Sequence, residues 1–187
     1  MKRILVLVIL VLVLALGLSA AQASVPPREK LIETLFARLR QAEDPVTAAH
    51  LRAMIGEVWS HSGSPTADLL MSRAEAALRA QNGEIAGKLL DRVVALYPDW
   101  GQAWRRLAQS AVESGDRDGA ILELGKALSI EPRDFLAMRQ LSELLLEDSK
   151  KPEALDLLRR AATLDPQDAA LAREVKDLTG EVEGRGI

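Results

Sequence analysis

Three prolines, Pro98, Pro132 and Pro166, recur at intervals of 34 residues in closely similar surroundings. Each is the third residue of a short segment that begins with a branched aliphatic residue: Leu-Tyr-Pro-Asp, Ile-Glu-Pro-Arg and Leu-Asp-Pro-Gln. A fixed period of this length is typical of proteins that stack one supersecondary unit on the next, and it accommodates two helices with their turns. The period therefore predicts an all-α solenoid of helix-turn-helix repeats, whose function rests on binding surfaces rather than on a reaction centre.

Alignment on the prolines divides the chain into repeats over residues 67–100, 101–134 and 135–168, of which the middle one is the clearest. Each half of that repeat places its large and small apolar residues three, four and seven positions apart, which puts them on one stripe of a helix. Between the halves, Ser114-Gly115-Asp116 has the composition of a helix end followed by a turn. The residues predicted to pack the repeats together are Trp104, Leu107, Ala108, Ala111, Ala120, Leu124, Ala127, Pro132, Ala154, Leu158, Ala161 and Pro166.

These positions resemble the tetratricopeptide-repeat (TPR) family, strongly over residues 67–168 and weakly before them. The chain looks most like the small exported TPR proteins of Gram-negative bacteria. The sequence departs from the family pattern in three places: Arg73 stands in place of a leucine, Gly83 lies two residues late, and Ser149 stands in place of the turn glycine. The resemblance implies a TPR-like superhelix, and the small residue at Ala120 and its equivalents allows the two helices of a repeat to approach closely.

The segments that flank the repeats also have helical patterns. Residues 24–66 contain two apolar stripes separated by Asp44-Pro45, which is typical of an N-cap followed by the first helical position. We interpret this segment as an N-terminal helical pair that forms a degenerate leading repeat or a cap. Residues 169–179 are predicted to form a C-terminal capping helix with a polar outer face, and residues 180–187 a flexible tail.

Residues 1–23 have the pattern of an export signal. Lys2-Arg3 precede an apolar run from Ile4 to Leu18, and Ala21-Gln22-Ala23 is a small-x-small cleavage site. The expectation is a signal peptide cleaved after Ala23 and a periplasmic mature protein. The alternative is an uncleaved segment that anchors the chain in the inner membrane, facing the periplasm, and only then would the protein contact a membrane.

Charge and composition narrow the classes of partner. Loss of Lys2 and Arg3 with the signal would lower the 24 basic side chains to 22, against 27 acidic ones, for a net charge of −5. A negative chain lacks the basic surface with which proteins displace counterions from nucleic acids, so no nucleic-acid partner is expected. The chain has no cysteine, so packing rather than disulfides must hold the fold.

The residue types that carry catalysis are sparse. The only histidines, His50 and His61, are 11 residues apart, which corresponds to about 16 Å along a helix and is too far for one metal ion. Glu57 and His61 could offer two ligands, whereas a zinc site needs three or four. No glycine-rich phosphate loop is present. We therefore expect no metal, no cofactor and no enzymatic activity.

In the TPR family, the first helices of the repeats line a concave groove. By register, the resemblance assigns to this groove a set that mixes two arginines with polar and apolar residues: Met71, Glu75, Gln102, Arg105, Gln109, Val112, Leu136, Arg139, Glu143 and Leu146. Such a surface suits a peptide or protein segment that carries a carboxylate and a few apolar side chains. The alternative for Arg105 and Arg139 is that they pair with neighbouring acids such as Glu143.

The interpretation that follows is a periplasmic, non-enzymatic adaptor that binds a peptide or protein partner in the concave groove and serves in the assembly of envelope complexes. That last step rests on analogy, because a fold does not determine a function. One alternative is a self-associating structural protein in which Trp59 and Trp100 make contacts between copies. The other is a TPR scaffold anchored in the inner membrane.

Overall fold

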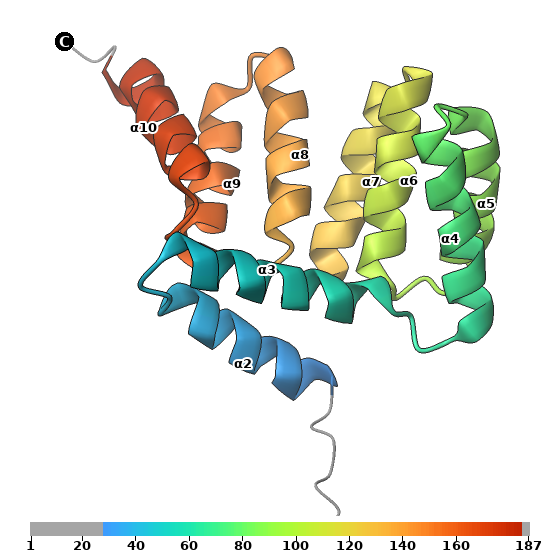
Figure 1. Ribbon diagram of the computed structural model, residues 1–187. Coiled ribbons are helices and arrows are strands. Elements are labelled where there is room, and N and C mark those ends of the chain that lie inside the picture. Colours follow the sequence, from blue (N-terminus) through green and yellow to red (C-terminus); the bar gives the residue numbers. More distant parts are fainter. Residues whose placement is uncertain (1–27, 185–187) are drawn as a thin grey trace, which may run out of the picture.

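The computed structural model describes residues 28–184, and within them the chain forms nine α-helices and no strand (Figure 1). The predicted all-α repeat architecture is confirmed. The prediction of a signal peptide over residues 1–23 and the last residues of the predicted tail lie outside the described part. The helices are α2 (Arg28–Arg40), α3 (Pro45–Ser60), α4 (Pro65–Arg79), α5 (Gly83–Leu96), α6 (Gly101–Ser114), α7 (Arg117–Ile130), α8 (Phe135–Glu147), α9 (Lys151–Leu164) and α10 (Ala169–Glu183).

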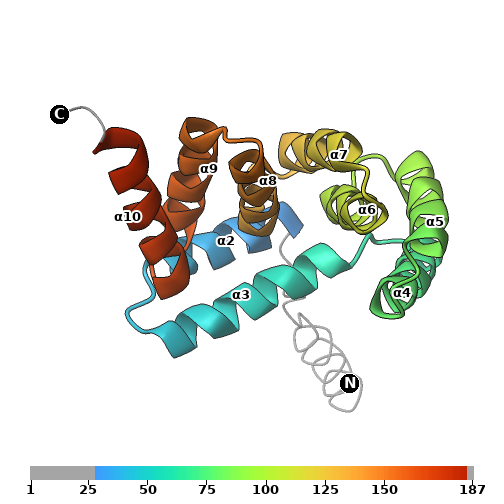
Figure 2. The same cartoon turned by 90° about the horizontal axis from the view of Figure 1, so that it is seen from above.

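Helices α4 to α9 form three antiparallel hairpins, and α10 packs on α9 as the first helix of a repeat that has no second helix among the described residues. Figure 2 shows α6 and α8 on the side that faces α3, with α7 and α9 behind them. Helix α10 runs four residues beyond its predicted end at residue 179. The tail prediction was wrong over this stretch because Val182 packs against the core and keeps the last turn in place.

The three repeat prolines have a different role from the predicted one, since Pro132 and Pro166 are exposed in the turns between repeats rather than packed inside. Each proline is the second residue of a four-residue turn closed by a backbone hydrogen bond. Trp100 N donates to Tyr97 O at 3.2 Å, and the corresponding bonds end at Asp134 and Asp168, at 3.1 and 3.3 Å. Proline suits this position because its ring holds φ near the value that the turn requires. We call these segments the proline turns: residues 97–100, 131–134 and 165–168.

Small residues set the distance between the helices of each hairpin. Ala86, Ala120 and Ala154, each the fourth residue of its hairpin's second helix, are all fully buried. A side chain that ends at Cβ lets two helix axes approach closely, whereas a longer one would separate them.

The Ala120→Leu variant is expected to lose about 1–3 kcal/mol of unfolding free energy, because the closely packed α6–α7 interface has no room for three more carbons. Thermal or urea unfolding followed by circular dichroism measures the loss. Ala76→Leu, on the exposed face of α4, is the matched control and should stay within about 0.5 kcal/mol of the wild type. Equal stability of the two variants would contradict the packing argument.

The N-terminal pair does not stack in front of α4, so its interpretation as a leading repeat or cap was wrong. Helix α2 packs on α3 and on α9, and α3 contacts α6. Figures 1 and 2 show α3 running along one edge of the solenoid, from α10 at one end towards α4 at the other. We call α2 and α3 together the strap.

The strap is held by an apolar interface with the last repeat. Phe36, Trp59 and Phe135 form an aromatic trio with ring centroids 5.8–6.2 Å apart. The apolar stripes that the sequence predicted for α2 and α3 are the ones buried here. They join residues of α8, α9 and α10 in one cluster that includes Ile32, Leu35, Leu39, Leu51, Ile55, Met138, Leu155, Leu158 and Leu171.

Each proline turn also makes a polar contact with the strap. In the first turn, Trp100 Nε1 donates to the carbonyl oxygen of Trp59 at 2.9 Å. In the second, Arg133 pairs with Glu29 at 2.9 Å. In the third, Arg52 pairs with the buried Asp165 at 2.6 Å, and Gln167 donates to the Ala42 carbonyl. The strap therefore connects all three repeats along the edge where their turns emerge.

One residue of α7 departs from the repeat pattern in a way that predicts a pH dependence. Glu123 stands where the neighbouring repeats have Leu89 and Leu157, and its Oε2 atom is buried without a hydrogen-bond partner. Burial, together with the charges of Asp116 and Asp91, raises the pKa of Glu123 to about 7. The Glu123 carboxyl therefore keeps its proton up to a higher pH in the folded protein than in the unfolded chain.

The Glu123→Gln variant is expected to be about 1–2 kcal/mol more stable than the wild type at pH 8, a gain moderated because the carboxyl is only half-buried. Near pH 4.5, the ordinary pKa of the group, the gain should be close to zero. The folded-state pKa is the higher one, so the wild type loses stability as the pH rises from about 4.5 to about 7. Urea unfolding at both pH values measures this, with the exposed Glu153→Gln as control. The same gain at both pH values would contradict the assignment.

Candidate protein-binding surface

The concave surface is formed by the first helices of the repeats, and three of the residues predicted to line it are buried instead. Met71, Gln102 and Arg105 are 4%, 8% and 7% exposed. Met71 belongs to the core between the first two repeats, together with Trp100. Gln102 lines a cavity beneath the strap residue Trp59. The placement of these three side chains on an open groove was therefore wrong.

Arg105 forms a buried ion pair rather than a contact for a partner. Its Nε donates to Asp134 Oδ2 at 3.0 Å, and the other oxygen of Asp134 accepts the backbone N–H groups of Leu136 and Ala137. Asp134 thus caps the start of α8 and neutralises a guanidinium of α6 at the same time. The pair joins two successive repeats from the inside.

The same pair recurs one repeat later in a more open form. Arg139 lies 3.4 Å from Asp168, the N-cap of α10, and 2.8 Å from Glu174. In the first repeat, the corresponding positions hold the apolar Met71 and Trp100. The recurrence of Arg and Asp at the 34-residue period was visible in the sequence and could have revealed the pairing. Both arginines predicted to hold a partner's carboxylate are already bound to carboxylates of this chain.

Between α4 and α6, the concave surface is polar and paired internally. Glu75 and Arg106 form an ion pair at 3.0 Å, and Gln109 accepts a hydrogen bond from Arg106. Burial and the charge of Arg105 lower the pKa of Arg106. These groups line a depression of about 240 Å³. Two apolar residues of the predicted groove are exposed to solvent. Val112, on α6, is 49% exposed, and Leu136, on α8, is 37% exposed.

Between α8 and α10 lies a larger hollow of about 490 Å³, which we call the acidic pocket. Its leucines come from three helices: Leu146, Leu158 and Leu178. Four acidic residues and one serine complete the lining: Glu143, Glu174, Asp177, Glu181 and Ser142. Glu143 and Leu146 were among the predicted groove residues, whereas the α10 residues that line the pocket were not.

The carboxylates of the acidic pocket differ in their pairing. Glu174 is paired with Arg139, and Glu181 with Lys151 at 2.6 Å. Glu143 and Asp177 make no ion pair or side-chain hydrogen bond with any residue in the described range 28–184. Two unpaired negative charges therefore lie beside the leucine side chains of the acidic pocket.

Neither a metal centre nor a membrane-spanning helix is found in the described residues. No group of three or more His, Asp or Glu side chains with the geometry to hold a metal ion occurs between residues 28 and 184. His61 and Glu57 approach one another at 3.8 Å at the exposed C-terminal end of α3. In the same range, no helix combines the length and apolar character needed to cross a bilayer.

The arrangement of hairpins and the concave surface define a helical repeat protein of the superhelical class. The sequence model of the tetratricopeptide repeat matches residues 71–129 and again residues 105–169, more than half of the chain. The chain belongs to the TPR family. A TPR repeat-containing protein of Rhizobium etli is 34% identical over 113 residues, which make up 60% of this chain and 55% of that relative. The chain thus spans about half the length of the curated relative that it matches.

Solved TPR structures share the fold. The TPR domain of Arabidopsis OM64 has a TM-score of 0.57 and 18% identity, covering 63% of this chain and 97% of that domain. The Yersinia enterocolitica type III secretion chaperone SycD, in complex with a peptide of the translocator YopD, has a TM-score of 0.56 and 19% identity, covering 65% and 92%. The first TPR domain of Spaghetti, bound to an HSP90 peptide, has a TM-score of 0.58 and 13% identity, covering 63% and 93%. TPR domains typically mediate protein–protein interactions and are generally non-enzymatic scaffolds.

Proposed function

We propose that this chain is a non-enzymatic adaptor that binds a protein partner through the acidic pocket, and that it does so in the periplasm during the assembly of envelope complexes. The observation that carries the proposal is the pair of unpaired carboxylates, Glu143 and Asp177, beside three leucines. Such a pocket suits a segment that presents apolar side chains together with lysine or arginine. This partner differs from the carboxylate-bearing one expected when Arg105 and Arg139 were assigned to the groove.

The peptide complexes of SycD and Spaghetti support the proposal, because in both of them a protein of this fold binds a peptide. The strap supports it as well, because it occupies the edge of the solenoid at the proline turns and leaves the far ends of α8 and α10 uncovered. A partner that binds these ends reaches the acidic pocket without displacing the strap.

The location in the periplasm rests on the signal pattern of residues 1–23. Mass spectrometry of the chain isolated from its host tests it directly: a mature N-terminus at Ser24 is expected. An intact Met1 would overturn cleavage and support the anchored scaffold.

The binding proposal is tested by crosslinking in cells, purification through a C-terminal tag, and identification of the proteins recovered. The Glu143→Lys/Asp177→Lys variant should lose an envelope protein that the wild type recovers, because it reverses both unpaired charges. Glu33→Lys/Glu153→Lys changes the net charge equally at exposed positions of α2 and α9 and should retain that protein. Equal recovery by both variants would overturn the site. Recovery of this chain alone, in every case, would favour the self-associating alternative.

A further inference from the structure

The two hollows of the concave surface occupy equivalent places in different repeats. The depression between α4 and α6 is lined by Glu75, Leu78, Arg79, Arg106 and Gln109. The acidic pocket is lined by residues at the same repeat positions further along the chain: Glu143, Leu146, Glu174, Asp177 and Glu181. Figure 2 shows α4, α6, α8 and α10 in this order along the solenoid. The concave surface therefore carries related hollows at its two ends.

The charge at two of these repeat positions changes sign along the solenoid. The position that Arg79 holds on α4 is occupied by glutamate on each later first helix: Glu113, Glu147 and Glu181. The position that Arg106 holds on α6 is occupied by Gln140 on α8 and by Glu174 on α10. The same positions thus carry positive charge at the α4 end and negative charge at the α10 end.

Pairing within the chain leaves charge uncompensated at both ends. In the depression, Glu75 pairs with Arg106, whereas Arg79 makes no ion pair within residues 28–184. Burial and the charge of Arg105 lower the pKa of Arg106, and the charge of Arg79 adds a smaller effect in the same direction. The depression therefore keeps one positive charge, while the two unpaired carboxylates of the acidic pocket keep two negative ones.

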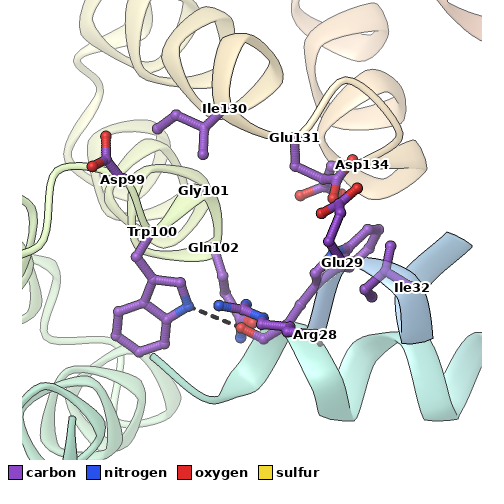
Figure 3. Close-up of a pocket in the computed structure, with 11 residues that line it drawn as sticks. Arg28, Glu29, Ile32, Asp99, Trp100, Gly101, Gln102, Ile130, Glu131 and Asp134 are labelled. Carbon is purple, nitrogen blue, oxygen red and sulfur yellow. Dashed lines mark hydrogen bonds between the residues drawn. The ribbon is translucent and has the colours of Figure 1, made fainter. Parts of the chain in front are cut away.

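Apolar side chains lie between the two ends. Leu78, Val112 and Leu146 hold one repeat position on α4, α6 and α8, and Val112, between the two hollows, is exposed. The strap covers the other end of α6, where Figure 3 shows Gln102 of α6 and Arg28 of α2 lining one cavity. That cavity shares no residue with either hollow. The C-terminal halves of the first helices are thus the part of the concave surface that the strap leaves open.

We propose that the concave surface binds an extended segment of the partner in one direction, with an acidic residue at the α4–α6 depression and basic residues at the acidic pocket. This inference rests on the proposed function, to which it adds the charge pattern and the orientation of the partner. The reverse orientation would bring like charges together at both ends, which disfavours it. Packed helices lie about 10 Å apart, so two steps between first helices span roughly 20 Å, the length of about six extended residues.

The test uses the ¹⁵N-labelled full chain and the capped peptide acetyl-Asp-Ser-Leu-Gly-Leu-Ser-Lys-Lys-amide, whose charges are separated by this length. A Kd below about 1 mM is expected. A spin label on a cysteine added at the acidic end of the peptide should broaden the amide signals of α4, and a label at the basic end those of α10. The protein has no cysteine with which the label could react. The reverse pattern, equal broadening at both ends, or no binding at about 10 mM peptide would overturn the proposal.

Two variants locate the acidic end of the peptide. Arg79→Glu is expected to weaken binding about fivefold, because an attraction becomes a repulsion. Arg92→Glu makes the same change of charge at an exposed position of α5 and should bind like the wild type. A peptide with lysine in place of its aspartate should regain affinity for Arg79→Glu, which a folding defect could not produce. Equal binding of the original peptide by both variants would contradict the proposed direction.

The Glu143→Lys/Asp177→Lys variant separates this inference from the proposed function. It should lose the peptide whichever way the peptide runs, because the acidic pocket is the proposed binding site. If this variant binds the peptide like the wild type, the proposed function fails. If it loses the peptide while Arg79→Glu retains full affinity, the direction fails and the proposed function stands.

Discussion

The Arg105→Met variant is expected to lose about 3–5 kcal/mol of unfolding free energy, although the residue reads as a surface arginine in the sequence. Its removal leaves the Asp134 carboxylate, which is 3% exposed, without its guanidinium partner. Methionine is the residue that the first repeat has at this position, so the substitution itself fits the register. Urea unfolding monitored by circular dichroism measures the change.

Arg139→Met is the matched control, since it removes the equivalent arginine one repeat later. That side chain is 30% exposed and its partners Asp168 and Glu174 are 20% and 43% exposed, so we expect a loss of about 1 kcal/mol or less. Adding Asp134→Asn to Arg105→Met keeps a capping oxygen and removes the unpaired charge, and it should recover at least about 1 kcal/mol. Similar losses for the two arginine variants would show that burial does not determine how much the Arg105–Asp134 pair contributes to the free energy of unfolding.

The Phe36→Ala variant is expected to release the strap, with a loss of about 3–5 kcal/mol. Phe36 is 1% exposed, contacts the rings of Trp59 and Phe135, and lies under the guanidinium of Arg133 at 5.4 Å. Hydrogen exchange should show loss of protection in α2 and α3 first, because α4 to α7 pack among themselves without help from α2. The variant is thus expected to lose both packing contacts and hydrogen-exchange protection in the strap.

Leu31→Ala, on the same helix but only partly buried, is the control and should cost about 1 kcal/mol. If Phe36→Ala lowered protection equally in all helices, the strap would be part of one cooperative unit with the repeats. If it lowered protection nowhere, the assignment of the aromatic trio as the main attachment would be wrong.

The repeat boundaries could be predicted from the sequence because they depend on local chemistry. Helices α6, α8 and α10 begin at Gly101, Phe135 and Ala169, immediately after the predicted repeat boundaries. Turn prolines, capping aspartates and apolar stripes act within a few residues along the chain, so they appear directly as pattern. The fully buried Ala120, Leu124 and Ala127 were likewise predicted from spacing alone.

The binding surface was harder to predict because exposure depends on what covers a helix face. Register assigned Glu143 and Leu146, which line the acidic pocket, and Arg105 and Gln102, which are buried, to the same open surface. Register gives only the direction of a side chain from its own helix. A capping carboxylate from the next repeat and the strap decide whether that direction leads to solvent.

The sequence by itself determined the helices, the turns between them and the stacking of three repeats, since each of these follows from interactions within one or two adjacent units. Only the tertiary structure decided where the first two helices lie. Their apolar stripes are compatible with a leading repeat, yet they bury more favourably on α8, α9 and α10, more than 70 residues further along the chain. Hydrophobic burial has no direction, so an amphipathic pattern shows that a face is covered without showing what covers it.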